Sequence, residues 1–134
     1  MTFYQTEVDK IKKACHSNEA QIRTVIGTRN FIDNNFEQEL NLDLLSGTQF
    51  TSKFHLLRLF KKYYGLTIRQ YLIERRLEKS KDLLSKGRSV TEACFAVGYE
   101  SLPSFSTLFK RKTGLTPIRF QKQQLSISKF DGDL

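Results

Sequence analysis

The sequence contains an internal repeat, and this repeat limits the folds that the chain can adopt. When Ser52 is placed on Ser101, an offset of 49 residues, the residues that follow align without a gap. Two further blocks agree at the same offset, namely Leu-Phe-Lys-Lys at 59–62 with Leu-Phe-Lys-Arg at 108–111, and Gly-Leu-Thr at 65–67 with Gly-Leu-Thr at 114–116. Agreement of this kind indicates one supersecondary unit that is built twice.

Each copy carries the residues that begin and end a helix. Ser52 and Ser101 are suited to N-cap a helix, because a serine oxygen can accept a hydrogen bond from a backbone N–H of the first turn. Gly65 and Gly114 can adopt the left-handed conformation that ends a helix. Ser-Val-Thr-Glu at 89–92 is a capping box that opens a shorter helix upstream of the second copy's longer one. We therefore predict that each unit is a short helix, a turn and a longer helix.

A continuous helix is expected between the two units. Thr-Ile-Arg-Gln at 67–70 is another capping box, and apolar residues continue at helical spacing to about Ser85, just before Gly87. The connector of about 19 residues would be about 28 Å long at roughly 1.5 Å per residue.

The N-terminal part predicts two helices in succession. Apolar residues fall at helical spacing at Tyr4, Val8, Ile11 and Cys15. The polar run at 16–18 is expected to end that helix, and Asn18, three residues before Gln21, is a capping pair that would open the next one. Gly27 disfavours this second helix by about 1 kcal/mol relative to Ala.

These observations predict an all-α chain of two helix-turn-helix lobes, each a homeodomain-like three-helix unit, joined by a long connector helix. The expected boundaries are an N-terminal extension at 1–20, the first lobe at 21–66, the connector at 67–86, the second lobe at 87–122 and a C-terminal tail at 123–134.

Positive charge is concentrated in the repeated part of the chain. Residues 1–48 carry five Lys or Arg against seven Asp or Glu, whereas residues 51–122 carry sixteen against five. Two helices joined by a tight turn are the usual means of placing a helix in the DNA major groove, although a single example is also common in helical bundles. Two copies within a basic segment favour double-stranded DNA as the partner.

Other classes of site have weaker support. Cys15 and Cys94 lie far apart and lack the neighbouring ligands of a metal site, so we interpret them as reduced, packed thiols. We expect no cofactor, no membrane span, no signal peptide and a cytoplasmic location. Since no nucleophile set, phosphate loop or carboxylate pair stands out, we expect the chain not to be an enzyme.

A family resemblance is carried by SKFHLLRLFKKYYGLTIRQYLIERRLEKSKDLL and by SVTEACFAVGYESLPSFSTLFKRKTGLTPIRF. The second stretch is the more specific, through Ala93, Val97, Gly98, Tyr99, Ser101, Phe105, Phe109, Lys110, Gly114, Thr116 and Pro117. Roughly residues 22–122 closely resemble the DNA-binding domain of the AraC/XylS family of bacterial transcription regulators. The resemblance implies one recognition helix per lobe, at about 52–63 and 101–112.

Carried over by position, the resemblance implies base-reading side chains at Phe54, Leu57, Arg58, Leu102, Pro103, Ser104 and Thr107. Arg58 is the foremost of these, since a guanidinium can donate two hydrogen bonds to guanine, although a phosphate contact or an ion pair would be the alternative role. The sequence departs from the family pattern at Pro103 and Ser104, and at Phe50, where many members have Gly.

Phosphate contacts are expected near the ends of the recognition helices, at Ser52, Lys53, Lys61, Lys62, Ser101, Lys110, Arg111 and Lys112. A solvated face that complements the helix dipole is an equally weighted interpretation of these cations. Arg76 is interpreted as a structural pairing residue. The connector length lies near the ~34 Å between successive major-groove faces, so a monomer is favoured on DNA and a dimer is left open.

The resemblance also implies an activator that contacts RNA polymerase, with repression as the alternative. Some alkylation-repair proteins carry such a domain, but they need a cysteine-rich metal site that two distant cysteines cannot supply. Two alternatives remain, a fragment of a larger ligand-sensing regulator and a protein-interaction module without specific DNA binding. The roughly 20 residues before the match are too few for a small-molecule pocket.

Overall fold

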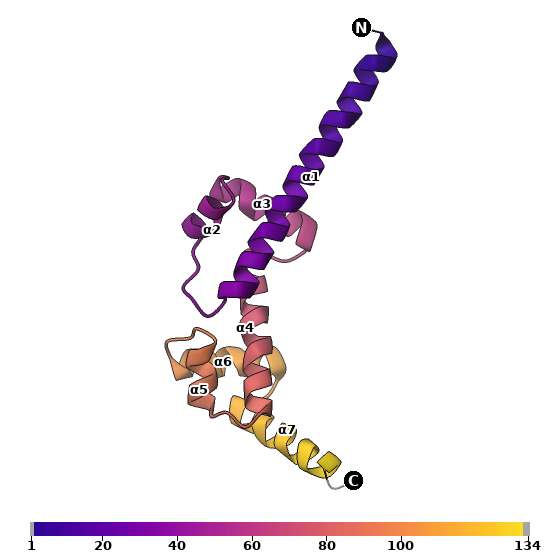
Figure 1. Ribbon diagram of the computed structural model, residues 1–134. Coiled ribbons are helices and arrows are strands. Elements are labelled where there is room, and N and C mark those ends of the chain that lie inside the picture. The colour runs from indigo at the N-terminus through magenta and orange to yellow at the C-terminus, as the bar shows by residue number, and fades with distance from the viewer. Residues whose placement is uncertain (1, 133–134) are drawn as a thin grey trace. The chain divides into compact units, whose positions relative to one another are not determined.

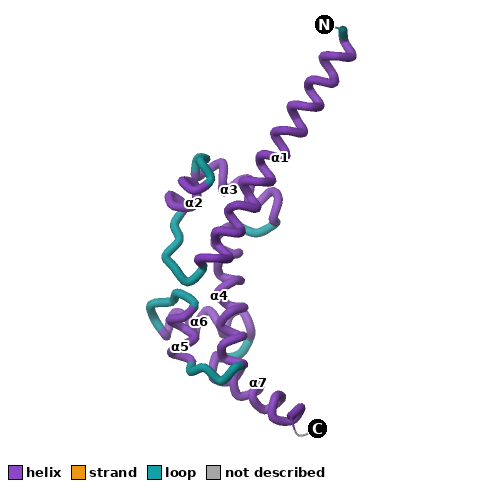
Figure 2. The backbone as a smooth tube through the Cα atoms, viewed as in Figure 1, coloured by secondary structure: helices purple, strands orange, loops and turns teal. Residues whose placement is uncertain are grey.

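The computed structural model describes residues 2–132, and at positions 3, 14–17 and 129–132 it describes the backbone only. Seven helices make up the described part of the chain, as the sequence predicted for an all-α fold (Figure 1). They are α1 (Phe3–Asn35), α2 (Leu42–Thr48), α3 (Lys53–Tyr64), α4 (Ile68–Ser85), α5 (Val90–Ala96), α6 (Leu102–Thr113) and α7 (Pro117–Gly132). Short loops join the helices within each pair α2–α3 and α5–α6 (Figure 2).

The chain forms two compact units that interleave in sequence. The first unit comprises residues 1–34 and 40–68, and the second comprises residues 35–39 and 69–134. The segment 35–39 was expected within the first lobe, but its contacts are with the second unit. The backbone therefore passes from one unit to the other three times.

Helix α1 corrects the expectation of two successive helices, because it runs from Phe3 to Asn35 without a break at 16–18. The predicted capping pair at Asn18 is therefore wrong. That segment contains neither Pro nor Gly, and its polar residues disfavour a helix interior only slightly, so a helix can propagate through it once both flanks are helical.

Gly27 also lies inside α1, where it permits close packing. A Cβ atom at Gly27 would overlap the side-chain amide of Gln49, the residue that follows α2. The absence of a side chain thus leaves room for the Gln49 amide, the flexible end of a side chain, beside α1.

The C-terminal residues 123–134 were expected to form a tail, yet α7 continues through the last described residue, Gly132. Thr116 caps this helix, because its side-chain oxygen accepts a hydrogen bond from Arg119 N at 3.3 Å. Pro117 then occupies the first turn, where a missing N–H has no intrahelical partner to lose.

Each unit has its own hydrophobic core. The first core includes the fully or nearly fully buried side chains of Val25, Ile32, Leu45, Leu56 and Phe60. The second contains Leu77, Leu84, Ala93, Cys94, Val97, Phe105 and Phe109. Its aromatic rings pack edge to face, with centroids 5.7 Å apart for Phe105 and Phe109 and 5.4 Å apart for Phe109 and Phe120.

Cys94 is a completely buried free thiol, as the sequence predicted for a packed cysteine. Burial raises the pKa of this thiol, because the low-polarity surroundings disfavour the thiolate. The prediction for Cys15 concerns a side chain outside the described residues.

The predicted caps are present at both longer helices. Ser52 Oγ accepts from His55 N at 3.2 Å at the start of α3, and Ser101 Oγ accepts from Ser104 N at 3.3 Å at the start of α6. The C-caps of α3 and α6 are left-handed glycines, Gly65 with φ 81° and Gly114 with φ 82°. The two helices therefore have the same length and the same ends.

Phe50 adopts an unfavourable backbone conformation in the turn before α3. Its φ is 53°, which places an L-residue in the left-handed region that glycine favours. The ring is 96% exposed, so little packing within the described part of the first unit offsets this conformation.

Replacing Phe50 by Gly is expected to stabilise the protein, because it relieves the left-handed conformation and removes almost no buried surface. The gain should be roughly 0.5–1 kcal/mol over Phe50→Ala, which removes the same ring but keeps a Cβ atom. Urea unfolding followed by far-UV circular dichroism measures this difference. Equal stability of the two variants would contradict the strain that we assign to this position.

Arg76 anchors the segment 35–39 on the second unit, in agreement with its interpretation as a structural residue. Its Nε donates a hydrogen bond to Phe36 O at 2.6 Å, and its Nη2 donates to Gln38 O at 2.9 Å. The guanidinium also lies over the ring of Tyr99, 5.4 Å from the centroid. A Cβ atom at Gly98 would stand only 2.7 Å from Glu37 O, so this glycine leaves room for the segment.

Arg76→Met is expected to destabilise the second unit by about 2–4 kcal/mol, because two carbonyls lose charge-assisted hydrogen bonds. The exposed Arg69→Met, on the same helix, is the control and should cost less than about 0.5 kcal/mol. Denaturation monitored by circular dichroism gives both values. A loss as small as that of the control would show that these contacts contribute little.

Candidate nucleic-acid interface

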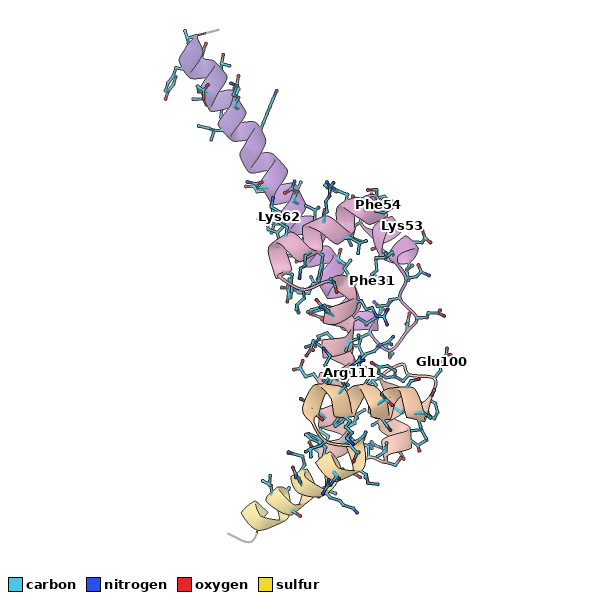
Figure 3. The ribbon with its side chains drawn as sticks, turned by 180° about the vertical axis from the view of Figure 1, so that it is seen from behind. Phe31, Lys53, Phe54, Lys62, Glu100 and Arg111 are labelled. Atoms are coloured by element: carbon cyan, nitrogen blue, oxygen red, sulfur yellow. The ribbon has the colours of Figure 1, made fainter. Side chains whose placement is uncertain are left out.

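Helix α3 has one face that is buried in the first unit and an opposite face that is exposed. Leu56, Leu59 and Phe60 are buried in the first unit. The other face carries exposed Phe54, Arg58, Lys61 and Lys62, with Leu57 half-buried. Figure 3 labels Lys53, Phe54 and Lys62 on this helix. The base-reading residues predicted for α3 are thus brought together on one side of the helix.

Helix α6 has the same division of faces in the second unit. Phe105 and Phe109 are buried, while the predicted base-reading residues Pro103, Ser104 and Thr107 are exposed. A shallow, open depression on this surface is lined by Pro103, Ser104, Thr107, Leu108 and Arg111. Three of the four side chains that the resemblance assigned to base reading on α6 therefore line one shallow depression.

Leu102 differs from the other predicted base-reading residues. Its side chain is half-buried and packs against the core of the second unit. Because part of its apolar surface is buried in the second unit, Leu102 exposes less surface for contact with a ligand than its neighbours do.

The predicted phosphate-binding cations differ in what they contact. Lys53 Nζ lies 2.6 Å from Asp43 Oδ1 of α2, and Lys112 Nζ lies 3.5 Å from Glu74 Oε1 of α4. Lys61 Nζ donates to Gly65 O at 3.1 Å, and Lys62 lies over the ring of Tyr63. Lys110 and Arg111 are exposed in the last turn of α6.

Ser52 and Ser101, also expected at phosphates, have a structural role in the caps. Each hydroxyl oxygen accepts a backbone hydrogen bond, but a hydroxyl group has a donor as well as acceptor sites. Capping therefore leaves each hydroxyl hydrogen able to donate to an anion.

Phe50 and Glu100 are exposed residues that the sequence analysis did not place in the site. Phe50 lies two residues before the cap of α3. Glu100, which is labelled in Figure 3, directly precedes the cap of α6. The signal for Phe50 was its departure from the glycine of the resembling family. Glu100 had no comparable signal, because an isolated acidic residue in a turn is ordinary.

The described part of the chain has no group of three or more His, Cys, Asp or Glu side chains placed to hold a metal ion. None of its described helices combines the length and hydropathy needed to cross a bilayer.

Comparison with known proteins identifies this architecture. The sequence profile described as "Helix-turn-helix domain" matches residues 47–123, which contain α3 to α6, the end of α2 and the first part of α7. The solved structure of a transcriptional regulator from Chromobacterium violaceum, described by its AraC-type DNA-binding domain, superimposes with a TM-score of 0.70 at 27% identity. That alignment covers 76% of this chain and 92% of the other. The chain belongs to the AraC/XylS family.

Two curated relatives illustrate the range of this family. The chain is 34% identical over 104 residues to the bifunctional transcriptional activator/DNA repair enzyme AdaA of Bacillus subtilis, covering 77% of this chain and 49% of that protein. It is 30% identical over 102 residues to the regulatory protein SoxS of Salmonella typhimurium, covering 75% of this chain and 92% of that protein. The chain thus spans about half of AdaA but corresponds to nearly the whole of SoxS.

Asp43→Asn is expected to strengthen binding to duplex DNA, because it releases Lys53 and removes a negative charge beside α3. We expect a gain of roughly threefold to tenfold at low salt, with little change in stability because the ion pair is exposed. Fluorescence anisotropy with a labelled duplex measures the affinity. Asp9→Asn, exposed near the start of α1, changes the net charge equally and serves as the control. Equal effects of the two substitutions would contradict a local role for Asp43.

Proposed function

We propose that this AraC/XylS-family chain regulates transcription by inserting α3 and α6 into the major groove of specific duplex DNA sites. The observation that carries the proposal is the equivalence of the two helices. Each has twelve residues, a serine N-cap and a glycine C-cap, and each has a buried apolar face that includes phenylalanine and an opposite, exposed face that carries basic residues. An α-helix of this kind fits the width of the major groove.

The side chains on these faces suggest distinct modes of reading. Arg58 can donate two parallel hydrogen bonds to O6 and N7 of guanine, whereas Phe54 can offer an apolar contact to a thymine methyl group. On α6, the hydroxyls of Ser104 and Thr107 can donate or accept, and Pro103 can only make apolar contacts. We therefore expect α3 to supply the stronger base discrimination.

The remaining contacts fix the position of the helices on the duplex. The amines of Lys61, Lys62 and Lys110, together with the guanidinium of Arg111, are exposed near the C-terminal ends of α3 and α6. Such groups bind phosphates without reading sequence and make affinity salt-dependent. Lys53 and Lys112 would exchange a carboxylate partner for a phosphate.

We infer further that the protein acts in the bacterial cytoplasm as an activator, that it contacts RNA polymerase, and that it has no catalytic activity. This inference rests on the transcription regulators among its relatives. A reporter driven by a selected target promoter gives the test, since contact with the polymerase predicts increased output that depends on the position of the site. Unchanged output would reject regulation from that promoter.

Selection of binding sites from a random duplex library at near-physiological salt tests the DNA-binding proposal. We expect an enriched, asymmetric element with two short motifs, one for each recognition helix. Arg58→Ala should lose the preference at one base pair, at a cost of about 1–3 kcal/mol, because the guanine-specific hydrogen bonds are absent. The exposed Arg23→Ala, on α1, controls for the loss of one positive charge.

Two results would overturn this assignment. Salt-sensitive binding without enrichment of any DNA sequence would show that this chain does not recognise a specific sequence. An equal loss of affinity for all sequences in Arg58→Ala would place that guanidinium on a phosphate rather than on a base.

A further inference from the structure

The N-terminal part of α1 extends beyond the packed portion of the first unit. Figures 1 and 2 show the helix continuing away from α2 and α3 toward its N-terminal end. Every described side chain between residues 2 and 20 is exposed or half-buried. This part of the helix does not contribute to the buried core of the unit.

An apolar stripe nevertheless runs along this extension. The exposed fractions are 75% for Tyr4, 62% for Ile11, and 41% for both Ile22 and Ile26, while Val8 is half-buried. At 100° per residue these five side chains fall within about 60° of one another around the helix axis. The stripe therefore forms one continuous face of α1.

This face differs from the face that packs in the core. Among the described side chains of α1, those of Val25, Thr28 and Ile32 are buried, and they lie on a different side of the helix from the centre of the stripe. The stripe is thus apolar surface that the described part of the first unit leaves largely uncovered.

The continuity of α1 gives the stripe its significance. A break at 16–18 would divide it into two short pieces, but the helix runs through that segment. The residues Tyr4, Val8, Ile11, Cys15, Asn18 and Ile22 then alternate at spacings of four and three along one rod. An average spacing of 3.5 residues is the pattern of a left-handed coiled coil.

We propose that this stripe pairs with the same stripe of a second copy of the chain, in parallel, and forms a short coiled-coil dimer. A symmetric pairing of this kind is self-complementary, because the same surface serves both partners. It also buries the exposed isoleucines and the tyrosine of both chains, which is the usual source of stability in such an interface.

The charges that flank the stripe favour a parallel arrangement. Glu7 and Lys12 occupy positions on opposite sides of the stripe, five residues apart. In a parallel coiled coil, residues with this spacing face each other across the interface, so Glu7 of each copy, which lies 3.5 Å from Lys10 of its own helix, would also come near Lys12 of the other copy. An antiparallel overlap of the same segments would bring the two Lys12 side chains together.

Asn18 fits the same interpretation. It is an exposed polar residue at a position of the repeat that would lie between the two helices. A polar side chain in such a seam lowers the stability of the coiled coil relative to an apolar one. Since the stripe is short and contains this residue, we expect a reversible dimer whose population rises with concentration.

Sedimentation equilibrium of the full chain tests the proposal over about 1–200 μM. The expected result is a concentration-dependent rise from 15.6 kDa toward twice that mass. Ile11→Glu should remain monomeric throughout, because it places like charges in the apolar seam. Lys13→Glu, on the opposite side of α1, is the matched control and should dimerise as the wild type does. A monomeric wild type, or a dimer that persists in Ile11→Glu, would overturn the proposal.

A charge exchange tests the orientation separately. Lys12→Glu should weaken the dimer, since Glu7 would then face glutamate, and the double variant Glu7→Lys, Lys12→Glu should restore it. Failure of the double variant to recover would reject the parallel pairing. Circular dichroism and the unfolding transition of each variant establish that the fold is retained, because these residues lie outside the buried core. The readout is mass, so the result is independent of whether the protein binds specific DNA.

Discussion

The guanidinium of Arg76 determines how the second unit is assembled. It donates hydrogen bonds from α4 to the carbonyls of Phe36 and Gln38, and its flat face lies over Tyr99 in the turn between α5 and α6. Three segments that are distant in sequence are therefore joined by one side chain. Gly98 complements this arrangement, because any side chain there would meet the carbonyl of Glu37. The segment 35–39 belongs to the second unit for this reason, although its neighbours on both sides belong to the first.

Local chemistry was sufficient to predict much of the fold. The serine caps and left-handed glycines of α3 and α6 are decided within a few residues, and the repeat showed that they occur twice. The prediction that the first helix ends at 16–18 was wrong, because a run of polar residues is only a weak signal for a helix end. Helix formation is cooperative, and the small penalties at 16–18 are less than the free energy gained by continuing an established helix. The role of Gly27 depends on Gln49, a residue 22 positions away, which local pattern cannot reveal.

The sequence also predicted which side chains of α3 and α6 are exposed, but not all of the contacts that these side chains make. Helical periodicity places Phe54 and Arg58 opposite the buried residues of α3, and the structure has them exposed on that side. The half-buried state of Leu102 and the pairing of Lys53 with Asp43 depend on how neighbouring helices pack. At Phe50, the sequence showed only that the residue departs from the glycine found in many family members. The left-handed backbone conformation of Phe50 is evident in the structure alone. Tertiary neighbours therefore decide how much of each side chain remains available to DNA.

The hydrogen bonds of Arg76 end on main-chain carbonyls, and this has an evolutionary consequence. Every residue type supplies a carbonyl, so substitutions at Glu37 or Gln38 leave the acceptors in place. Both of these side chains are exposed, whereas Arg76 and Gly98 cannot be exchanged so freely. The segment can thus acquire new charges and shapes beside the second helix-turn-helix without losing its attachment. Substitutions in this segment can therefore change the surface while the hydrogen bonds beneath it remain the same.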